Sequence, residues 1–170
     1  MIVDACRSLR AEKVRIICPT FQMIYRQWNP KTWLKPVLHF LRYKMQAPNL
    51  ISSCSYVEDE QLPYYYGAAD IVLVPRKEIL NSGSLPLGFL MHKVVVGPNV
   101  GNVGEILQET GNVVFDAENS TATLPVSLRE AFTFSQQGKG EENYQYAMQN
   151  WGTDRIAAQV YEEYRELCHQ

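Results

Sequence analysis

The sequence predicts an α/β fold, with a Rossmann-like parallel sheet of about five strands, helices on both faces and a long C-terminal helix. Two observations predict it. Short apolar runs alternate with stretches whose apolar residues recur at helical spacing. The runs are apolar throughout, without polar alternation, which is typical of strands buried on both faces of a parallel sheet. At 170 residues, the chain is long enough for one well-buried core.

The first elements are short. Val3–Leu9 can form one or two helical turns, and Val14–Cys18 is an apolar-rich strand that Pro19 stops. Leu34–Met45 carries apolar residues at a spacing close to one helical face, which predicts a helix. Leu50–Cys54 is predicted to be the second strand.

The middle of the chain alternates helix and strand most clearly. Asp59–Gly67 is predicted to be a helix because Asp59 is a suitable cap and Gly67 lies near its end. The apolar run Ile71–Val74 is the third predicted strand. A helix over Ser82–Met91 and a strand over Lys93–Gly97 follow it.

The last part of the chain is mainly helical. A short helix over Val103–Glu109 precedes a strand at Asn112–Phe115, and Thr121–Phe134 is again helical. Gly138 and Gly140 mark a break before a long helical stretch. That stretch covers Glu141–Leu167 and is predicted to be kinked near Gly152. We expect residues 1–170 to form a single domain, on which the helical extension 139–170 packs back.

Composition excludes several classes of protein. The formal net charge of −2 gives no case for binding nucleic acid, which usually needs a basic face. No apolar run approaches the roughly 20 residues that span a bilayer, and the N-terminus lacks the apolar core of a signal peptide. The scattered cysteines predict buried free thiols in a cytoplasmic protein, and the dispersed histidines make a metal site unexpected. These residues are Cys6, Cys18, Cys54, Cys168, His39, His92 and His169.

Ligands of a parallel sheet bind beyond the carboxyl ends of its strands, so the loops 55–58, 75–84 and 97–104 matter most. The second loop ends in Asn81, Ser82, Gly83 and Ser84, where Asn81 or Ser82 can cap the helix and Gly83 lacks a Cβ that would obstruct its exposed amides. Such a helix start suits an anion, above all a phosphate. The same residues are equally suited to a simple capped turn.

The run from Tyr56 to Phe115 resembles the donor-binding half of GT-B glycosyltransferases, of the sort that includes family-4 retaining enzymes and bacterial polysaccharide-type transferases. No single motif is decisive, and the resemblance depends on their order. The matching segments are Leu62–Tyr66, Ala68–Ile71, Pro75, Asn81–Ser84, His92–Gly97, Gly101–Ile106 and the closing stretch Trp151–Leu167.

The resemblance implies a nucleotide-sugar donor, UDP- or GDP-linked, and no other cofactor or metal. It also implies glycosyl transfer to a saccharide or glycolipid. The donor diphosphate would lie on the amides of Gly83, Ser84 and Leu85 and on the hydroxyls of Ser82 and Ser84. Backbone around Tyr56 and Val57 would border the nucleobase. Sugar or charge contacts would come from Arg76, Lys77, Glu78 and Asn81, although Arg76 and Lys77 also suit solvated loop positions.

The chain departs from the family pattern in three places. The two glutamates usual around the phosphate helix align with Ile79 and Leu87, and only Glu78 is close enough to replace one of them. The family's Gly-Lys-Pro is replaced by His92-Lys93-Val94 in this sequence. By contrast, Glu105 matches a family glutamate whose role is structural.

The third departure is at the N-terminus. The family's donor domain begins with a strand and a basic pair, whereas this sequence starts at the following helix. We therefore expect the chain alone to bind the nucleotide-sugar donor at best, and to transfer the sugar poorly or not at all. The absent strand is central in the family's sheet. The five others would close the gap, recruit a strand from another chain, such as a second copy, or leave backbone groups unpaired.

Other functions stay open at this point. A non-catalytic module could use the aromatic segment Phe21–Trp33 and the tyrosines at 64–66 as an interaction surface, or these side chains could be core. A sugar-nucleotide epimerase needs a histidine in the cleft, and His92 aligns with a turn glycine instead. A doubly wound regulator needs acidic residues after the first strand, where Pro19 stands.

Overall fold

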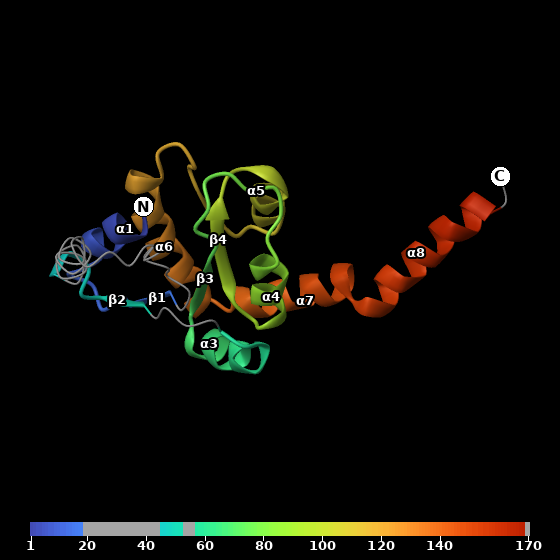
Figure 1. Cartoon of the computed structure of the whole chain (residues 1–170), viewed down its shortest axis with the longest axis horizontal. Coiled ribbons are helices and arrows are strands. Elements are labelled where there is room, and N and C mark those ends of the chain that lie inside the picture. Colours follow the sequence, from blue (N-terminus) through green and yellow to red (C-terminus); the bar gives the residue numbers. More distant parts are fainter. Residues whose placement is uncertain (19–44, 53–56, 169–170) are drawn as a thin grey trace, which may run out of the picture.

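The computed structural model describes residues 1–18, 45–52 and 57–168, which form helices around parallel β-sheet structure (Figure 1). The elements are α1 (Ile2–Ser8), β1 (Ile16–Cys18), β2 (Leu50–Ser52), the 3-10 helix η1 (Asp59–Gln61), α3 (Leu62–Ala68), β3 (Ile71–Leu73), α4 (Ser84–Leu90), β4 (Val94–Pro98), α5 (Gly101–Glu109), β5 (Val113–Phe115), α6 (Ser120–Gln136), α7 (Lys139–Trp151) and α8 (Thr153–Cys168).

The strands form two sheets, so the α/β class is confirmed and the single sheet of about five strands is wrong. β1 pairs in parallel with β2, and β4 pairs in parallel with β3 on one side and β5 on the other. No strand of the described ranges joins β1 to β3. In Figure 1, β3 and β4 run up the view while β1 and β2 run across it. The apolar runs predicted strands correctly, but they contain no information on which strands pair.

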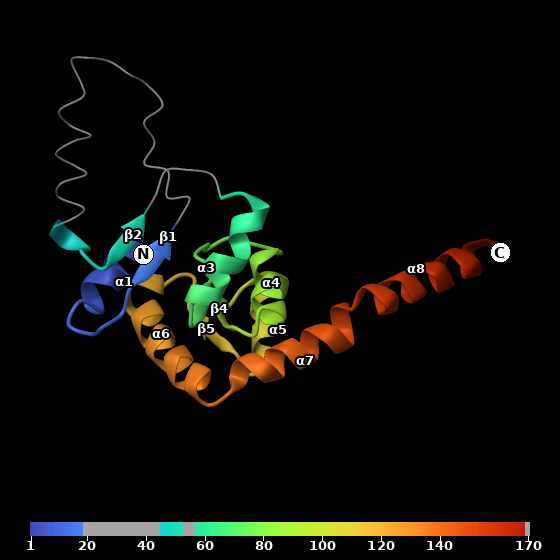
Figure 2. The same cartoon turned by 90° about the horizontal axis from the view of Figure 1, so that it is seen from below.

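Two layers of helices cover the three-stranded sheet. On one side, Leu124 and Leu128 of α6 pack with Val94, Val96 and Phe115 of the sheet, and this cluster also contains residues of α1. On the other side, helices α4, α5 and α7 cover the opposite faces of β3 and β4. Figure 2 shows α6 and α1 on one side of β4 and β5, with α4 and α5 on the other. The arrangement is that expected of a parallel sheet buried on both faces.

Helix α7 packs against α4, and its C-terminal end is held by aromatic side chains. The ring of Phe89 in α4 stacks on Trp151 at 5.5 Å between centroids, and it meets Tyr146 edge-on at 6.1 Å. Gly152 has extended backbone (φ −58°, ψ 136°) and separates α7 from α8, which confirms the predicted kink.

Every described side chain of α8 is exposed, and the helix projects from the body of the protein (Figures 1 and 2). Within the predicted extension 139–170, α7 packs on α4, whereas α8 is exposed along its described length. No helix within 1–18, 45–52 and 57–168 has both the length and the apolar character needed to cross a membrane.

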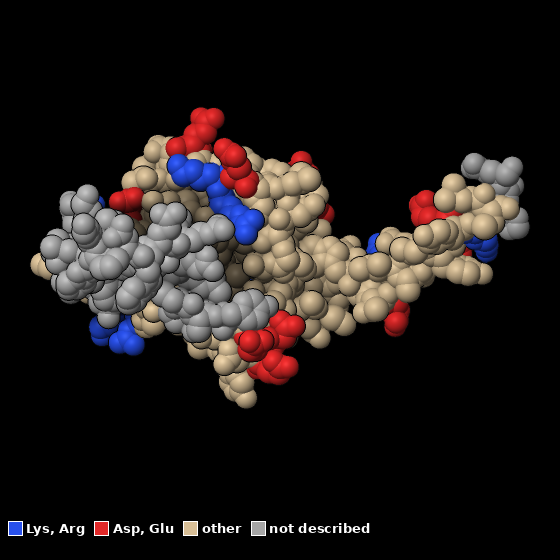
Figure 3. Space-filling model, in the orientation of Figure 1, with Lys and Arg blue, Asp and Glu red and all other residues tan. Residues whose placement is uncertain are grey.

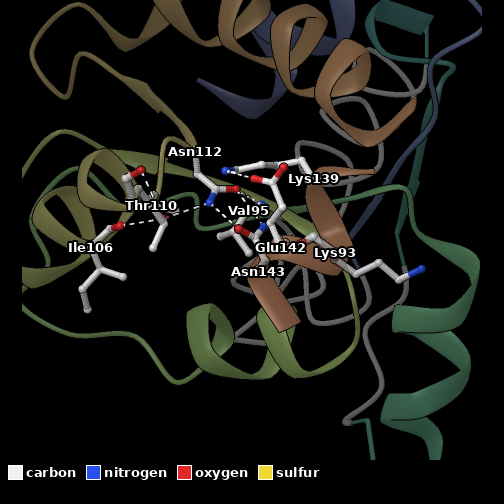
Figure 4. A network of polar contacts seen from close by, with 9 residues as sticks. Lys93, Val95, Ile106, Thr110, Asn112, Lys139, Glu142 and Asn143 are labelled. Atoms are coloured by element: carbon white, nitrogen blue, oxygen red, sulfur yellow. Dashed lines mark hydrogen bonds and ion pairs between the residues drawn. The ribbon is translucent and has the colours of Figure 1, made fainter. Parts of the chain in front are cut away.

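A buried pair of asparagine amides joins α7 to the sheet (Figure 4). The side chain of Asn112 donates to Asn143 Oδ1 at 2.7 Å, and Asn143 donates back to Asn112 Oδ1 at 2.9 Å. The remaining N–H groups donate to the Lys93 carbonyl at 2.9 Å and to Thr110 Oγ1 at 2.9 Å. All four amide N–H groups are thus paired, as buried polar groups must be. No local sequence pattern indicated this contact, because the two residues are 31 positions apart.

Among the described cysteines, Cys6 is buried, Cys18 is half-buried and Cys168 is exposed, and all three are free thiols. The predicted burial is therefore confirmed for Cys6 and wrong for Cys168, which lies on the exposed helix α8. Burial, helped by the nearby Cys18, raises the pKa of the Cys6 thiol to about 11. Cys6 is therefore a protonated core residue with no nucleophilic role at neutral pH. The predictions on Leu34–Met45, Phe21–Trp33, Cys54 and Tyr56 lie wholly or mostly outside the described residues.

Candidate functional site

The loop between β3 and α4, residues 74–83, lies at the carboxyl end of β3. In doubly wound sheets, ligands bind beyond the carboxyl ends of the strands where the order of strands reverses. The described strands form two separate parallel sheets, and β3 is an edge strand of the three-stranded one. The loop 74–83 leaves the carboxyl end of this edge strand.

The start of α4 is only partly open. Gly83 is exposed, and a Cβ built on it would meet nothing within 4 Å. However, the Leu85 N–H donates to the Ser82 carbonyl at 3.1 Å, and the Ser84 N–H donates to Ser82 Oγ at 3.3 Å. Pro86 has no N–H at all. The Ser84 and Leu85 amides, which were expected to hold a diphosphate, therefore donate within the turn itself in this structure. The open backbone is at Gly83.

The loop is fixed against the start of α5. Asn102 donates from Nδ2 to Asn81 Oδ1 at 2.8 Å, which joins the two helix starts. Gly101 has a left-handed backbone (φ 59°), and a Cβ there would overlap the Ile79 carbonyl oxygen. Glycine is needed at 101 for both reasons. Asn81 was predicted as a sugar or charge contact, and in this structure it positions the loop.

Tyr66, at the end of α3, borders the start of α4. Burial raises the pKa of the Tyr66 phenol, and the nearby Ser84 side chain opposes the shift. Ser84 itself is half-buried. Val57 is buried, so its side chain belongs to the core and only its backbone could border a ligand.

The charged residues of the loop face solvent. Arg76, Lys77 and Glu78 are all exposed. Figure 3 shows basic side chains next to acidic ones above the upper, carboxyl edge of the sheet, so this edge is of mixed charge. A bound anion would meet local cations without a broad positive field.

The two positions that align with the family's glutamates have structural roles. Ile79 packs on the cluster that contains Val74 and Leu85, and Leu87 is half-buried in α4. Glu105 is exposed on α5. Ile79 and Leu87 therefore supply no carboxylate to the loop.

Sequence analysis missed the setting of His92. It has φ 55°, the only positive φ of a residue other than glycine in the described part of the chain. Its ring stacks on Tyr144 at 4.0 Å between centroids, and Nδ1 lies 2.9 Å from Glu141 Oε2. His92 aligns with a turn glycine of the family, and glycine positions in turns often have positive φ, so the alignment could have indicated this backbone conformation. Both His92 and Glu141 are exposed.

Two shallow cavities adjoin the opposite, amino edge of the sheet. One has a volume of about 280 Å³ and is lined by Asp70, His92, Lys93 and Glu141 among others. The second, about 200 Å³, lies at Lys139 and Glu142. Neither is lined by residues of the loop 74–83. Within the described ranges, no group of three or more His, Cys, Asp or Glu side chains could hold a metal ion.

Comparison with known proteins assigns no family. No protein-family model matches the chain, and no curated protein matches it significantly.

Proposed function

We propose that the chain is a donor-binding domain that holds the diphosphate of a nucleotide-sugar, UDP- or GDP-linked, at the carboxyl edge of β3. The observation that carries the proposal is the position of the loop 74–83, which leaves the carboxyl end of the edge strand of a parallel sheet and ends in the unobstructed backbone of Gly83. The ordered motifs between Tyr56 and Phe115 support the same class of ligand.

In this proposal the phosphate contacts differ from those expected at first. The Gly83 N–H and the Ser82 hydroxyl supply the donors at the start of α4, and Arg76 and Lys77 supply positive charge from the loop. The contact between Asn81 and Asn102 keeps the loop in place before the ligand arrives. Preorganised donors of this kind stabilise charge on a departing diphosphate, which is the electrostatic task in glycosyl transfer. The acceptor would be a saccharide or glycolipid held by another domain or chain.

Calorimetric titration with UDP and with GDP tests the proposal. We expect measurable binding of at least one nucleotide, and we expect Gly83→Asp to raise its Kd at least about tenfold, because a carboxylate would then face the diphosphate. Aspartate is a favourable residue at the N-terminal cap of a helix and meets open space here, so the variant should keep its thermal stability.

The control is Gln149→Glu, which adds the same single negative charge at an exposed position near the C-terminal end of α7. This variant should bind the nucleotide as tightly as the original chain. Equal losses in both variants would indicate a non-specific charge effect. Failure of the original chain to bind either nucleotide would contradict the proposal.

One observation favours a second candidate, an interaction module derived from the same fold. The exposed helix α8 carries apolar side chains at intervals of four, four and three residues, namely Ile156, Val160, Tyr164 and Leu167. This spacing forms one stripe along a helix. A chain that binds no nucleotide but associates through this stripe would be such a module. Sedimentation of the chain and of its Val160→Asp variant distinguishes the two candidates.

A further inference from the structure

Helix α8 projects from the body of the protein, and its apolar stripe is left uncovered by the described part of the chain (Figures 1 and 2). The stripe consists of Ile156, Val160, Tyr164 and Leu167, and these residues are between 45% and 66% exposed. A helix of 16 residues without tertiary packing is marginal in water, because most helical stability in proteins comes from burying an apolar face. The stripe therefore indicates a partner surface for α8.

Two other surfaces fit this stripe poorly. Helix α7, which leads into α8, exposes mainly polar side chains, so α8 finds no continuous apolar face by folding back along it. These side chains are Glu141, Glu142, Gln145 and Gln149, and Met148 is the large apolar exception. A membrane surface also fits poorly, because helices that lie on anionic lipid usually have a basic polar face. The polar face of α8 is acidic instead, with Asp154, Glu162, Glu163 and Glu166 against Arg155 and Arg165.

A second copy of α8 matches the stripe when the two helices run in opposite directions. In one register, Ile156 lies level with Leu167 of the second copy and Val160 lies level with its Tyr164, so each stripe residue meets an apolar partner. Residues follow one another by about 100° around a helix, which places Gln159 and Glu163 on the same flank of the stripe. Equal flanks meet in an antiparallel two-fold pair. The same register therefore allows the Gln159 amide of each copy to donate to the Glu163 carboxylate of the other.

The place of α8 on the molecule favours the antiparallel direction. A parallel pair would bring both bodies together at the Thr153 end of α8, whereas an antiparallel pair holds them at opposite ends (Figures 1 and 2). Antiparallel helices also bring opposite ends of their dipoles together. We propose that α8 is a self-association helix, whose apolar stripe pairs antiparallel with that of a second copy of this chain. The four side chains expose on the order of 500 Å² per helix, so the pair buries roughly 1,000 Å², the size of a weak and reversible contact.

Sedimentation equilibrium of the full chain tests the pairing at concentrations between about 5 and 500 μM. We expect a reversible equilibrium of monomer and dimer with a Kd in the micromolar range. Val160→Asp should raise this Kd at least about tenfold, because it places a charge from each copy in an apolar contact. The matched control is Ala158→Asp, which adds the same charge on nearly the opposite side of α8 and should leave the Kd unchanged. A chain that stays monomeric at the highest concentration, or equal losses in both variants, would overturn the inference.

Disulfide cross-linking tests the direction of the two helices. Thr153→Cys places a thiol at the first residue of α8, and Cys168 is an exposed free thiol at its last residue. Under mild oxidation, the antiparallel register predicts dimers in which position 153 of one copy is linked to position 168 of the other, as identified by peptide mass spectrometry. A parallel pair would link 153 to 153 and 168 to 168, and a predominance of these links would contradict the inference.

The pairing is independent of the proposed nucleotide site. Val160 lies on α8, outside the loop 74–83, so Val160→Asp should bind UDP or GDP as the original chain does. Loss of the dimer with nucleotide binding retained, and absence of nucleotide binding in a chain that dimerises, are therefore separate results. The first supports the stripe as the contact, and the second would contradict the proposed function alone.

Discussion

Replacing Gly140 by alanine is expected to destabilise the protein by about 3 kcal/mol. Gly140 is buried in the first turn of α7, directly against the backbone of His92. An alanine Cβ would overlap the His92 carbonyl oxygen and lie 2.8 Å from the carbonyl carbon. Because these are backbone atoms that cannot rotate aside, α7 would have to move away from the sheet. Urea unfolding monitored by circular dichroism measures the loss as a lower midpoint.

Gly67 in α3 offers the matched control. It is exposed, and a Cβ there would meet nothing within 4 Å. Alanine is favoured over glycine in a helix by up to about 1 kcal/mol, so Gly67→Ala should leave stability unchanged or raise it. If Gly140→Ala proved as harmless as Gly67→Ala, α7 would not pack on the His92 turn as described.

Replacing Asn143 by alanine is expected to cost about 2–4 kcal/mol of folding free energy. The substitution removes both bonds between the two amides and leaves the Asn112 side chain and the Lys93 carbonyl without their buried partner. It also leaves a cavity at a residue that is 1% exposed. Thermal and urea unfolding measure the change.

A double-mutant cycle separates the amide pair from the cavity. Asn112→Ala, Asn143→Ala and the double variant should give a coupling energy of about 1–3 kcal/mol, because either single change already breaks the pair. Asn150→Ala is the control, since its amide makes only a local bond to the Tyr146 carbonyl and should cost much less. Additive effects of Asn112→Ala and Asn143→Ala would show that the two side chains do not act together.

The positions of helices and strands followed from the sequence because they depend on local spacing. The strand at Asn112–Phe115 and the helix break at Gly152 were both visible as apolar runs and turn residues, and both are present. Sheet pairing was not predictable in the same way, because it joins segments far apart in the chain. The stretch Ile71–Leu73 would have the same apolar pattern whether it had one neighbour or two.

The sequence predicted where the candidate loop lies in the fold, but not the hydrogen bonds within it. The loop from Pro75 to Gly83 does lie at the carboxyl end of β3. Residue type indicated a helix start at Ser82, whereas α4 begins at Ser84. The N–H groups of Ser84 and Leu85 donate to Ser82 within the turn, and the sequence did not indicate these bonds. The bond between Asn81 and Asn102 joins residues 21 positions apart, and no local pattern could indicate it.

The account depends most on where a diphosphate binds, and titration of the ¹⁵N-labelled chain with UDP and GDP locates it residue by residue. Binding at the carboxyl edge of β3 predicts the largest amide shift changes at Arg76, Lys77 and Gly83, with smaller ones at Asn102. No changes with either nucleotide, or changes confined to the cavity at Asp70 and His92 on the opposite edge, would contradict it.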